Sequence, residues 1–174
     1  HWVSLDHAVA ARTLTEHLLG KGYRRFGYLG WNSNDFAAAT RFKAVNSCLP
    51  AHGLQLFAPD IFDVPPNAPG GKRGLQVLLG EYDPDVVMFS NDTAATGALV
   101  HCLEKGIPVP EELAIAGFSG LASAQALARP LTTIKTPRYQ IGRRAARVIL
   151  NRLGGIEYGP RMDLGFQLLE GSTS

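Results

Sequence analysis

The chain has 174 residues, of which 45% are hydrophobic and 18% charged, and its formal net charge is +2. This composition is typical of an ordinary globular protein and argues against collagen, coiled coil and extended disorder. No apolar stretch approaches the about 20 residues that a membrane-spanning helix needs. Two cysteines cannot form a disulfide framework. The length predicts one domain, or one domain with part of another.

Buried strands are predicted by four short apolar runs, at residues 26–29, 61–64, 86–89 and 113–116. Runs without alternation are typical of parallel strands that are covered on both faces. The segments between these runs repeat their apolar residues at intervals of three and four, which predicts helices. The alternation of strand and helix therefore predicts an α/β fold with a doubly wound parallel sheet, built from right-handed βαβ units.

Outside this core, the pattern predicts two further helices. One spans residues 7–19, with Asp6 as its N-cap, and the other spans residues 139–153. The second helix is expected to turn its apolar residues inward, namely Ile141, Ala145, Val148, Ile149 and Leu153. A crossing strand is predicted at residues 131–134 and a final strand around residues 162–168.

The loops after the predicted strands contain candidate binding residues. In open parallel sheets, ligands bind beyond the carboxyl ends of the strands. Trp31 follows the first predicted strand, Asn91 the third and Ser119 the fourth. Such aromatic, amide and hydroxyl groups suit a neutral or anionic polyol ligand. For Asn91, helix capping alone is an equally strong alternative.

Arg41 and Asp6 complete the candidate set. Arg41 falls in the helix after the first predicted loop, and arginine is the residue best suited to bidentate capture of a carboxylate or a diol. A solvated helix face is the alternative for Arg41. Helix capping is the alternative for Asp6.

The sequence argues against an enzyme and against a metal or cofactor site. Residues 117–120 follow a predicted strand, as a nucleophile elbow does, but Leu121 replaces the last glycine of that motif and all five histidines lie upstream. The histidines are scattered, and spacings typical of metal ligands are absent. Seven basic residues and no acidic ones lie between residues 113 and 156, which is interpreted as a solvated or partner-subunit surface.

Several passages together resemble the effector-binding domain of the LacI/GalR family of transcriptional regulators. The most specific are KGIPVPEELAIAGF at residues 105–118 and RPLTTIKTPRYQIGRRAARVIL at residues 129–150. Two further passages support them, HLLGKGYRRFGYLG at residues 17–30 and PDVVMFSNDTAATGAL at residues 84–99. Arg41 in ATRFKAV is similar to the family's R-x-x-G pattern, with Ala44 in place of glycine.

The resemblance implies a periplasmic-binding-protein-like fold of two lobes that close on a small-molecule effector. It implies one nearly complete C-terminal lobe, at residues 23–130 and 156–174, with parts of an N-terminal lobe and crossovers at residues 1–22 and 131–155. It also implies a homodimer, a cytoplasmic location, no membrane partner, and operator DNA bound through a helix-turn-helix upstream of His1. The lack of an initial methionine agrees with that expectation.

The implied effector pocket includes Asp6, Arg41, Asn91 and Ser119. The family usually has Asp where Ser119 and Gly120 stand here, and a pocket without that carboxylate should better tolerate an anion. The ending MDLGFQLLEGSTS is similar to the gluconate-type repressors of the family. A repressor that senses a sugar or a sugar acid such as gluconate is therefore expected. The alternative is a periplasmic solute-binding protein of a sugar transporter, which shares the fold.

Overall fold

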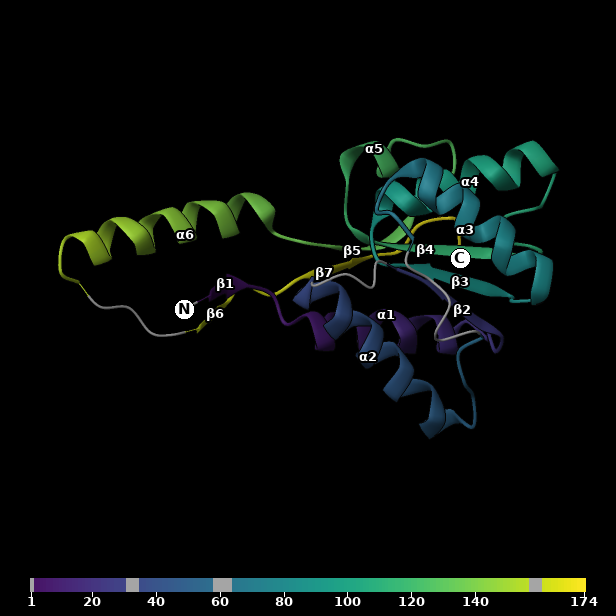
Figure 1. Ribbon diagram of the computed structural model, residues 1–174, viewed down its shortest axis with the longest axis horizontal. Helices are drawn as coiled ribbons and strands as arrows, with labels where there is room; N and C mark the ends of the chain where they lie inside the picture. The colour runs from purple at the N-terminus through teal and green to yellow at the C-terminus, as the bar shows by residue number, and fades with distance from the viewer. Residues whose placement is uncertain (1, 31–34, 58–63, 157–160) are drawn as a thin grey trace.

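A computed structural model describes residues 2–30, 35–57, 64–156 and 161–174 (Figure 1). Within this part of the chain, every helix is too short or too polar to span a membrane. In chain order, the elements are β1 (Trp2–Ser4), α1 (His7–Gly20), β2 (Phe26–Leu29), α2 (Phe36–Cys48), the 3-10 helix η1 (Leu49–His52), α3 (Ala68–Glu81), β3 (Val86–Phe89), α4 (Asp92–Lys105), β4 (Ala114–Ser119), α5 (Ala122–Gln125), β5 (Thr132–Lys135), α6 (Arg138–Leu153), β6 (Arg161–Asp163) and β7 (Gln167–Leu169).

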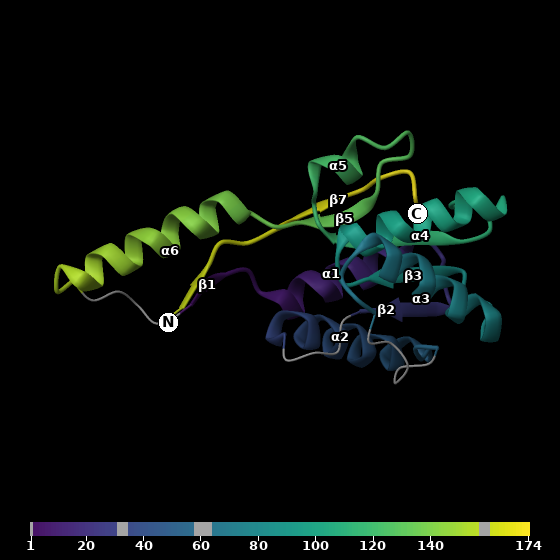
Figure 2. The same ribbon diagram turned by 45° about the horizontal axis from the view of Figure 1, so that its top comes forward.

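The main body contains a five-stranded sheet in the order β2-β3-β4-β5-β7. Strands β2 to β5 pair in parallel, whereas β7 pairs antiparallel with β5. Helices α1 and α2 cover one face of the sheet, and α3 and α4 cover the other (Figures 1 and 2). The predicted doubly wound parallel sheet is therefore confirmed, with one antiparallel edge strand added.

Alternate residues of the central strands contribute to two separate apolar clusters. In β3, Val86 and Met88 face α1 and α2, whereas Val87 and Phe89 face α3 and α4. All four side chains are at most 2% exposed. Because both faces of the strand are apolar, its sequence is a continuous hydrophobic run, and such runs predicted the central strands correctly.

Most predicted elements agree with the structure to within a few residues. Strands β2 and β3 have the predicted bounds, and β4 begins one residue later than expected and continues to Ser119. The strand predicted at residues 61–64 falls mostly outside the described residues. The predicted final strand is two short strands, because Gly165 adopts a left-handed φ of 68° between β6 and β7.

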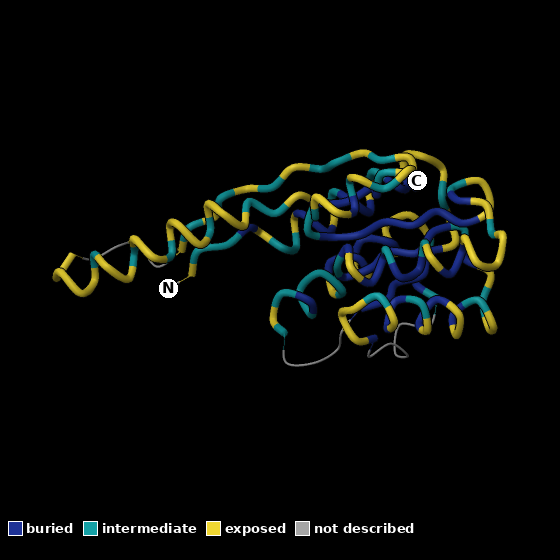
Figure 3. The backbone as a smooth tube through the Cα atoms, turned by 90° about the horizontal axis from the view of Figure 1, so that it is seen from above, coloured by how far each residue is buried: buried dark blue, intermediate teal, exposed yellow. Residues whose placement is uncertain are grey.

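Helix α6 differs from the sequence-based expectation. It extends from the main body and packs beside a two-stranded parallel sheet of β1 and β6 (Figures 1 and 3). The prediction of an inward apolar face is wrong for Ile149 and Leu153, which are 60% and 81% exposed. The other predicted inward residues are only partly buried, namely Ile141, Ala145 and Val148. Two three-residue strands are too narrow to cover a helix of 16 residues.

The division of the chain between two lobes stays a prediction. In the structure, the apolar face of α1 packs against the five-stranded sheet, and β5 is a strand of that sheet. Of the segments assigned to the N-terminal lobe and crossovers, β1 belongs to the two-stranded sheet and α6 packs beside it.

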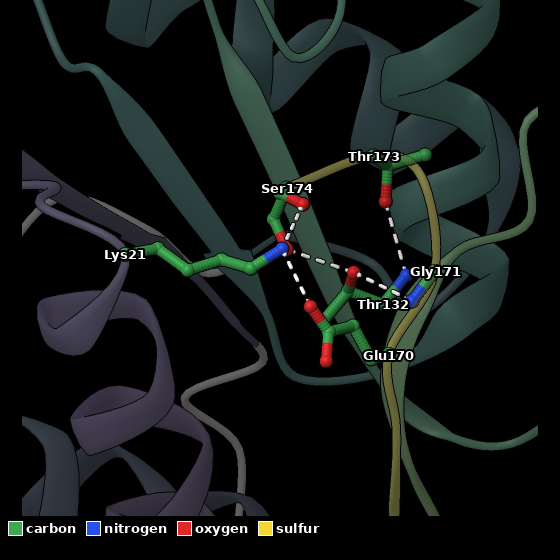
Figure 4. Close-up of polar contacts among 6 residues, drawn as sticks. All are labelled: Lys21, Thr132, Glu170, Gly171, Thr173 and Ser174. Carbon is green, nitrogen blue, oxygen red and sulfur yellow. Dashed lines mark hydrogen bonds and ion pairs between the residues drawn. The ribbon is translucent and has the colours of Figure 1, made fainter.

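A polar cluster holds the last residues of the chain against β4 and β5 (Figure 4). The Thr173 hydroxyl is buried, accepts a hydrogen bond from the backbone N–H of Thr132 (3.0 Å) and donates one to a carbonyl of β4 (2.7 Å). Lys21 Nζ donates to the carbonyl oxygen of Ser174 (2.6 Å) and forms an ion pair with Glu170 (2.9 Å). Hydrogen bonds rather than apolar burial therefore fix the segment that follows β7.

Helices α3 and α4 approach each other closely through two glycines. A Cβ atom at Gly71 would lie 1.9 Å from the carbonyl oxygen of Ala94, and one at Gly97 would lie 1.9 Å from that of Ala68. Both obstacles are backbone atoms, which cannot rotate away as a side chain can. The two helices can therefore share one face of the sheet only while both positions lack a side chain.

Gly71→Ala is expected to destabilise the chain by about 2–3 kcal/mol, because the added methyl group forces α3 away from α4. Gly80→Ala lies in the same helix, where a Cβ atom meets nothing within 4 Å, and is expected to stabilise the chain by about 0.5–1 kcal/mol. Urea unfolding followed by circular dichroism measures both changes. Equal stabilities of the two variants would contradict the close approach of the helices.

Candidate functional site

The carboxyl ends of β2, β3 and β4 meet at one edge of the five-stranded sheet, since these strands are parallel neighbours. Side chains from three elements come together there: His7 of α1, Arg41 of α2 and Phe118 of β4. Trp31, the predicted aromatic candidate, lies outside the described residues. Arg41 is the predicted residue at the centre of this group.

Three contacts hold the guanidinium of Arg41. Its Nη1 donates a hydrogen bond to the carbonyl oxygen of Ser90 (2.7 Å), and its Nε donates one to Nδ1 of His7 (3.2 Å). Its Cζ lies 4.0 Å from the centre of the Phe118 ring, in a cation–π contact. Burial lowers the pKa of Arg41, but an arginine side chain stays protonated in proteins. The site therefore contains a fixed positive charge.

The charge of Arg41 has no carboxylate within ion-pair distance among the residues that the structure describes. Asp35, the N-cap of α2, raises the pKa of Arg41 through its charge without forming an ion pair. Desolvation of a cation without a counter-charge is costly. The N–H groups that Ser90 and His7 leave unused can donate to the carboxylate or hydroxyl groups of a ligand.

His7 is a site residue that the sequence did not single out. Its Nδ1 accepts the hydrogen bond from Arg41, its Nε2 lies 3.3 Å from Oγ of Ser4, and its ring centre lies 6.0 Å from that of Phe118. Burial, followed by the charge of Arg41, lowers the pKa of His7 to about 4, so the imidazole is neutral at neutral pH. The signal that could have identified it is its place directly after the N-cap Asp6, on a helix that begins at this edge of the sheet.

Asp6 and Asn91 are both helix caps. Oδ1 of Asp6 accepts hydrogen bonds from the backbone N–H groups of Ala8 and Val9 (both 2.9 Å). Oδ1 of Asn91 accepts one from the backbone N–H of Ala94 (2.8 Å). The capping alternative is therefore confirmed for Oδ1 of both side chains. A ligand contact by the remaining polar atom of each stays a prediction.

Ser119 ends β4 in an unusual backbone conformation, with a φ of 144°. Few residues other than glycine adopt a positive φ, and such strain often occurs at functional sites. The turn that follows is held by Asp92, whose buried carboxylate accepts hydrogen bonds from the backbone N–H of Leu121 (2.6 Å) and from Oγ1 of Thr133 (2.6 Å). Burial raises the pKa of Asp92, although these hydrogen bonds favour its charged form.

Each contact of Arg41 is made by the chain neighbour of another predicted residue. These neighbours are Asp6 and His7, Ser90 and Asn91, and Phe118 and Ser119. The predicted residues therefore converge on one edge of the sheet. Among the described residues, however, the four predicted side chains make no direct hydrogen bond with one another.

The chemistry of this edge suits binding. Across residues 2–30, 35–57, 64–156 and 161–174, no group of three or more His, Cys, Asp or Glu side chains is placed to hold a metal ion. The contacts of Arg41 and His7 are with a carbonyl oxygen, an aromatic ring and a hydroxyl group. Such groups can orient a ligand that carries hydroxyl or carboxylate oxygens.

Comparisons with known proteins agree with this fold. The family model of the periplasmic binding protein-like domain matches residues 15–174. The HTH-type transcriptional regulator GntR of Pseudomonas aeruginosa is 35% identical over 96% of this chain and 49% of its own length. The HTH-type transcriptional regulator IdnR of Escherichia coli is 30% identical over 98% of this chain and 52% of its own length.

Solved structures show the same likeness. The crystal structure of transcription regulator GntR from Chromobacterium violaceum has a TM-score of 0.89 and 35% identity, over 99% of this chain and 64% of that one. A LacI family regulator from Silicibacter pomeroyi has a TM-score of 0.86 and 30% identity, over 98% of this chain and 53% of that one.

The fold and the edge around Arg41 define a domain of the periplasmic-binding-protein type. The chain belongs to the periplasmic binding protein-like family, and the solved structures that it resembles include regulators of the LacI family. It spans about half the length of the curated relatives it matches. These relatives are named as regulators, which agrees with the prediction that the chain is not an enzyme.

Acidification is expected to destabilise the chain through His7. The pKa of His7 is about 4 in the folded chain and its ordinary value is 6.5, because burial and, to a smaller extent, the charge of Arg41 lower it, whereas Asp35 and Asp6 raise it. Between these values the unfolded chain binds a proton that the folded chain does not, so the free energy of unfolding falls as the pH decreases through this range. The expected loss is about 1.5 kcal/mol, because partial exposure of His7 reduces the full effect.

Urea titrations across this pH range measure that loss. His7→Asn removes the titrating group and is expected to show a weaker pH dependence of stability than the unchanged chain. The same pH dependence in both proteins would show that His7 is not held neutral by its surroundings.

Proposed function

We propose that this chain is the effector-binding domain of a ligand-responsive, cytoplasmic transcriptional repressor. Effector binding would favour one arrangement of two lobes and change the affinity of an attached DNA-binding domain for its operator, which is a coupling between two sites. Family membership and relatives named as HTH-type regulators support the proposal. Residues 23–130 and 156–174 would form the C-terminal lobe, and residues 1–22 and 131–155 would contribute to the N-terminal lobe and crossovers.

The proposed effector is a sugar or a sugar acid of the gluconate type. The observation that carries this proposal is the guanidinium of Arg41 at the binding edge, without a carboxylate partner among the described residues. Ser119 stands where the family usually has Asp, so one negative charge is absent from that part of the edge. Both features favour a ligand that carries its own carboxylate.

A periplasmic solute-binding protein of a sugar transporter is the competing function. It shares the fold, and its pocket would be built at the same edge of the sheet. The relatives named above are transcriptional regulators, which favours the repressor. The residues encoded upstream of His1 distinguish the two functions, since a helix-turn-helix supports a repressor and a signal peptide supports a transport protein.

Arg41→Ala in the full-length protein is expected to weaken gluconate binding at least tenfold, because a hydrogen bond to a charged group contributes about 1.5–3 kcal/mol. Operator binding without effector is expected to stay unchanged. Isothermal titration calorimetry measures the first effect and an electrophoretic mobility shift the second. Lys43→Ala removes an exposed lysine of the same helix and is the matched control, with unchanged affinity.

Two results would contradict these assignments. Unchanged gluconate affinity in Arg41→Ala would show that the pocket lies elsewhere. In a thermal-shift panel of sugar acids, neutral sugars and purines, stabilisation by neutral sugars or purines alone would exclude the sugar-acid class.

We also propose that the protein is a homodimer, as the family resemblance implies. On α4, Leu103 is 83% exposed and Val100 is 44% exposed, beside a hollow of about 340 Å³ that is also lined by Ile107 and Leu127. Exposed apolar side chains gathered in one place are typical of protein–protein interfaces. A second copy of the chain is the proposed occupant of this surface.

Leu103→Glu is expected to shift the full-length protein from dimer to monomer in sedimentation velocity, because a carboxylate would be buried at the interface. Val9→Glu is the control, since Val9 is 51% exposed on α1, which covers the opposite face of the sheet. Circular dichroism establishes that both variants are folded. A monomeric unsubstituted protein, or a dimeric Leu103→Glu variant, would contradict the proposal.

A further inference from the structure

A continuous set of contacts joins strand β1 to the binding edge. Oγ of Ser4, on β1, lies 3.3 Å from Nε2 of His7, and Nδ1 of the same ring lies 3.2 Å from Nε of Arg41. Nη1 of Arg41 lies 2.7 Å from the carbonyl oxygen of Ser90, which directly follows β3. The imidazole thus lies between the two-stranded sheet and the guanidinium at the end of the larger sheet.

The chemistry of these groups determines the direction of each hydrogen bond. A guanidinium can only donate, so Nδ1 of His7 must accept and carries no proton. In the neutral ring the proton is then on Nε2, which donates to the hydroxyl oxygen of Ser4. Arg41 therefore selects the tautomer of His7, and Ser4 accepts a hydrogen bond from Nε2 and so helps to orient the ring.

The same contacts restrict the orientation of Arg41. An unrestrained arginine side chain has many rotamers, and binding of a ligand would have to order it. Here His7 restrains Nε, Ser90 restrains Nη1 and the Phe118 ring restrains the plane of the guanidinium. Of these three partners, His7 is the one with an ionisable side chain, and it lies on α1 whereas Arg41 lies on α2. Removal of His7 would therefore release the contact between the two helices at Nε of Arg41.

We infer that His7 is a positioning residue, which holds the guanidinium of Arg41 in its effector-binding orientation and is itself oriented by Ser4. This inference rests on the proposed function, in which Arg41 binds the carboxylate or hydroxyl groups of the effector. His7 acts through Arg41 and needs no contact with the effector. His7 also links the effector-binding edge to β1 through Ser4. The orientation of Arg41 therefore depends on the position of the two-stranded sheet.

The first experiment needs no effector. In the chain labelled with ¹⁵N, nuclear magnetic resonance is expected to show His7 as the Nε2–H tautomer and the Nε–H of Arg41 exchanging slowly with solvent. His7→Ala should increase that exchange rate at least tenfold. His7→Asn, whose amide oxygen can replace Nδ1 as acceptor, should restore slow exchange, and His52→Ala, at an exposed histidine elsewhere, should change nothing.

The second experiment measures gluconate affinity in the full-length protein by calorimetry. His7→Ala is expected to weaken binding about tenfold, His7→Asn to recover most of the affinity, and Ser4→Ala to weaken binding by a smaller factor. Equal melting temperatures of His7→Ala and His7→Asn would separate the positioning role from a loss of stability. Full affinity in His7→Ala, or equal loss in His7→Ala and His7→Asn, would overturn the inference.

The two experiments separate failure of the inference from failure of the proposed function. Rapid exchange of the Arg41 Nε–H in the unsubstituted chain, or no effect of His7→Ala on it, overturns the positioning role whatever the effector is. Absence of gluconate binding by the unsubstituted protein overturns the proposed effector class. In that case, the exchange rates alone support or overturn the role of His7.

Discussion

Helices cover both faces of β2, β3 and β4, and this double coverage decides where polar chemistry can lie in the chain. A polar side chain within these strands would be buried without water, at a cost of several kcal/mol unless it were hydrogen-bonded. Side chains that bind a ligand are therefore expected at the carboxyl ends of the strands, in the loops after them and in the helix segments beside them. Gly71 of α3 and Gly97 of α4 contribute to this coverage, because their lack of a side chain lets both helices pack closely on one face of the sheet.

The proposed binding edge combines helix caps and contacts of Arg41 in neighbouring residues. Asp6 and Asn91 cap helices, while the residues next to them, His7 and Ser90, contact Arg41. Caps stabilise a helix by about 1 kcal/mol each, so one short segment both begins a helix and supplies a partner for the guanidinium. The partly buried charge of Arg41 opposes stability, which is the usual cost of a site prepared for a ligand.

Helix α6 and the strands β1 and β6 show how much burial depends on the surrounding elements. The spacing of apolar residues in α6 is that of a helix with one buried face, as in α1. Helix α1 lies on a five-stranded sheet and buries that face, whereas α6 lies beside two short strands and leaves Ile149 and Leu153 exposed. Periodicity therefore predicts the helix, and the width of the neighbouring sheet decides whether its face is covered.

The sequence by itself determined the central strands β2, β3 and β4 with the helices between them and the helix caps at Asp6 and Asn91, and it predicts the edge at which ligands would bind. These features depend on local patterns: continuous apolar runs, capping residues and the rule that places sites after parallel strands. Only the tertiary structure decided that β7 pairs antiparallel with β5, that Asp92 holds the turn after Ser119, and that His7 accepts a hydrogen bond from Arg41. His7 and Arg41 are 34 positions apart, and such a contact leaves no periodic signal in a single sequence because it exists only when two helices pack on the same face of the sheet.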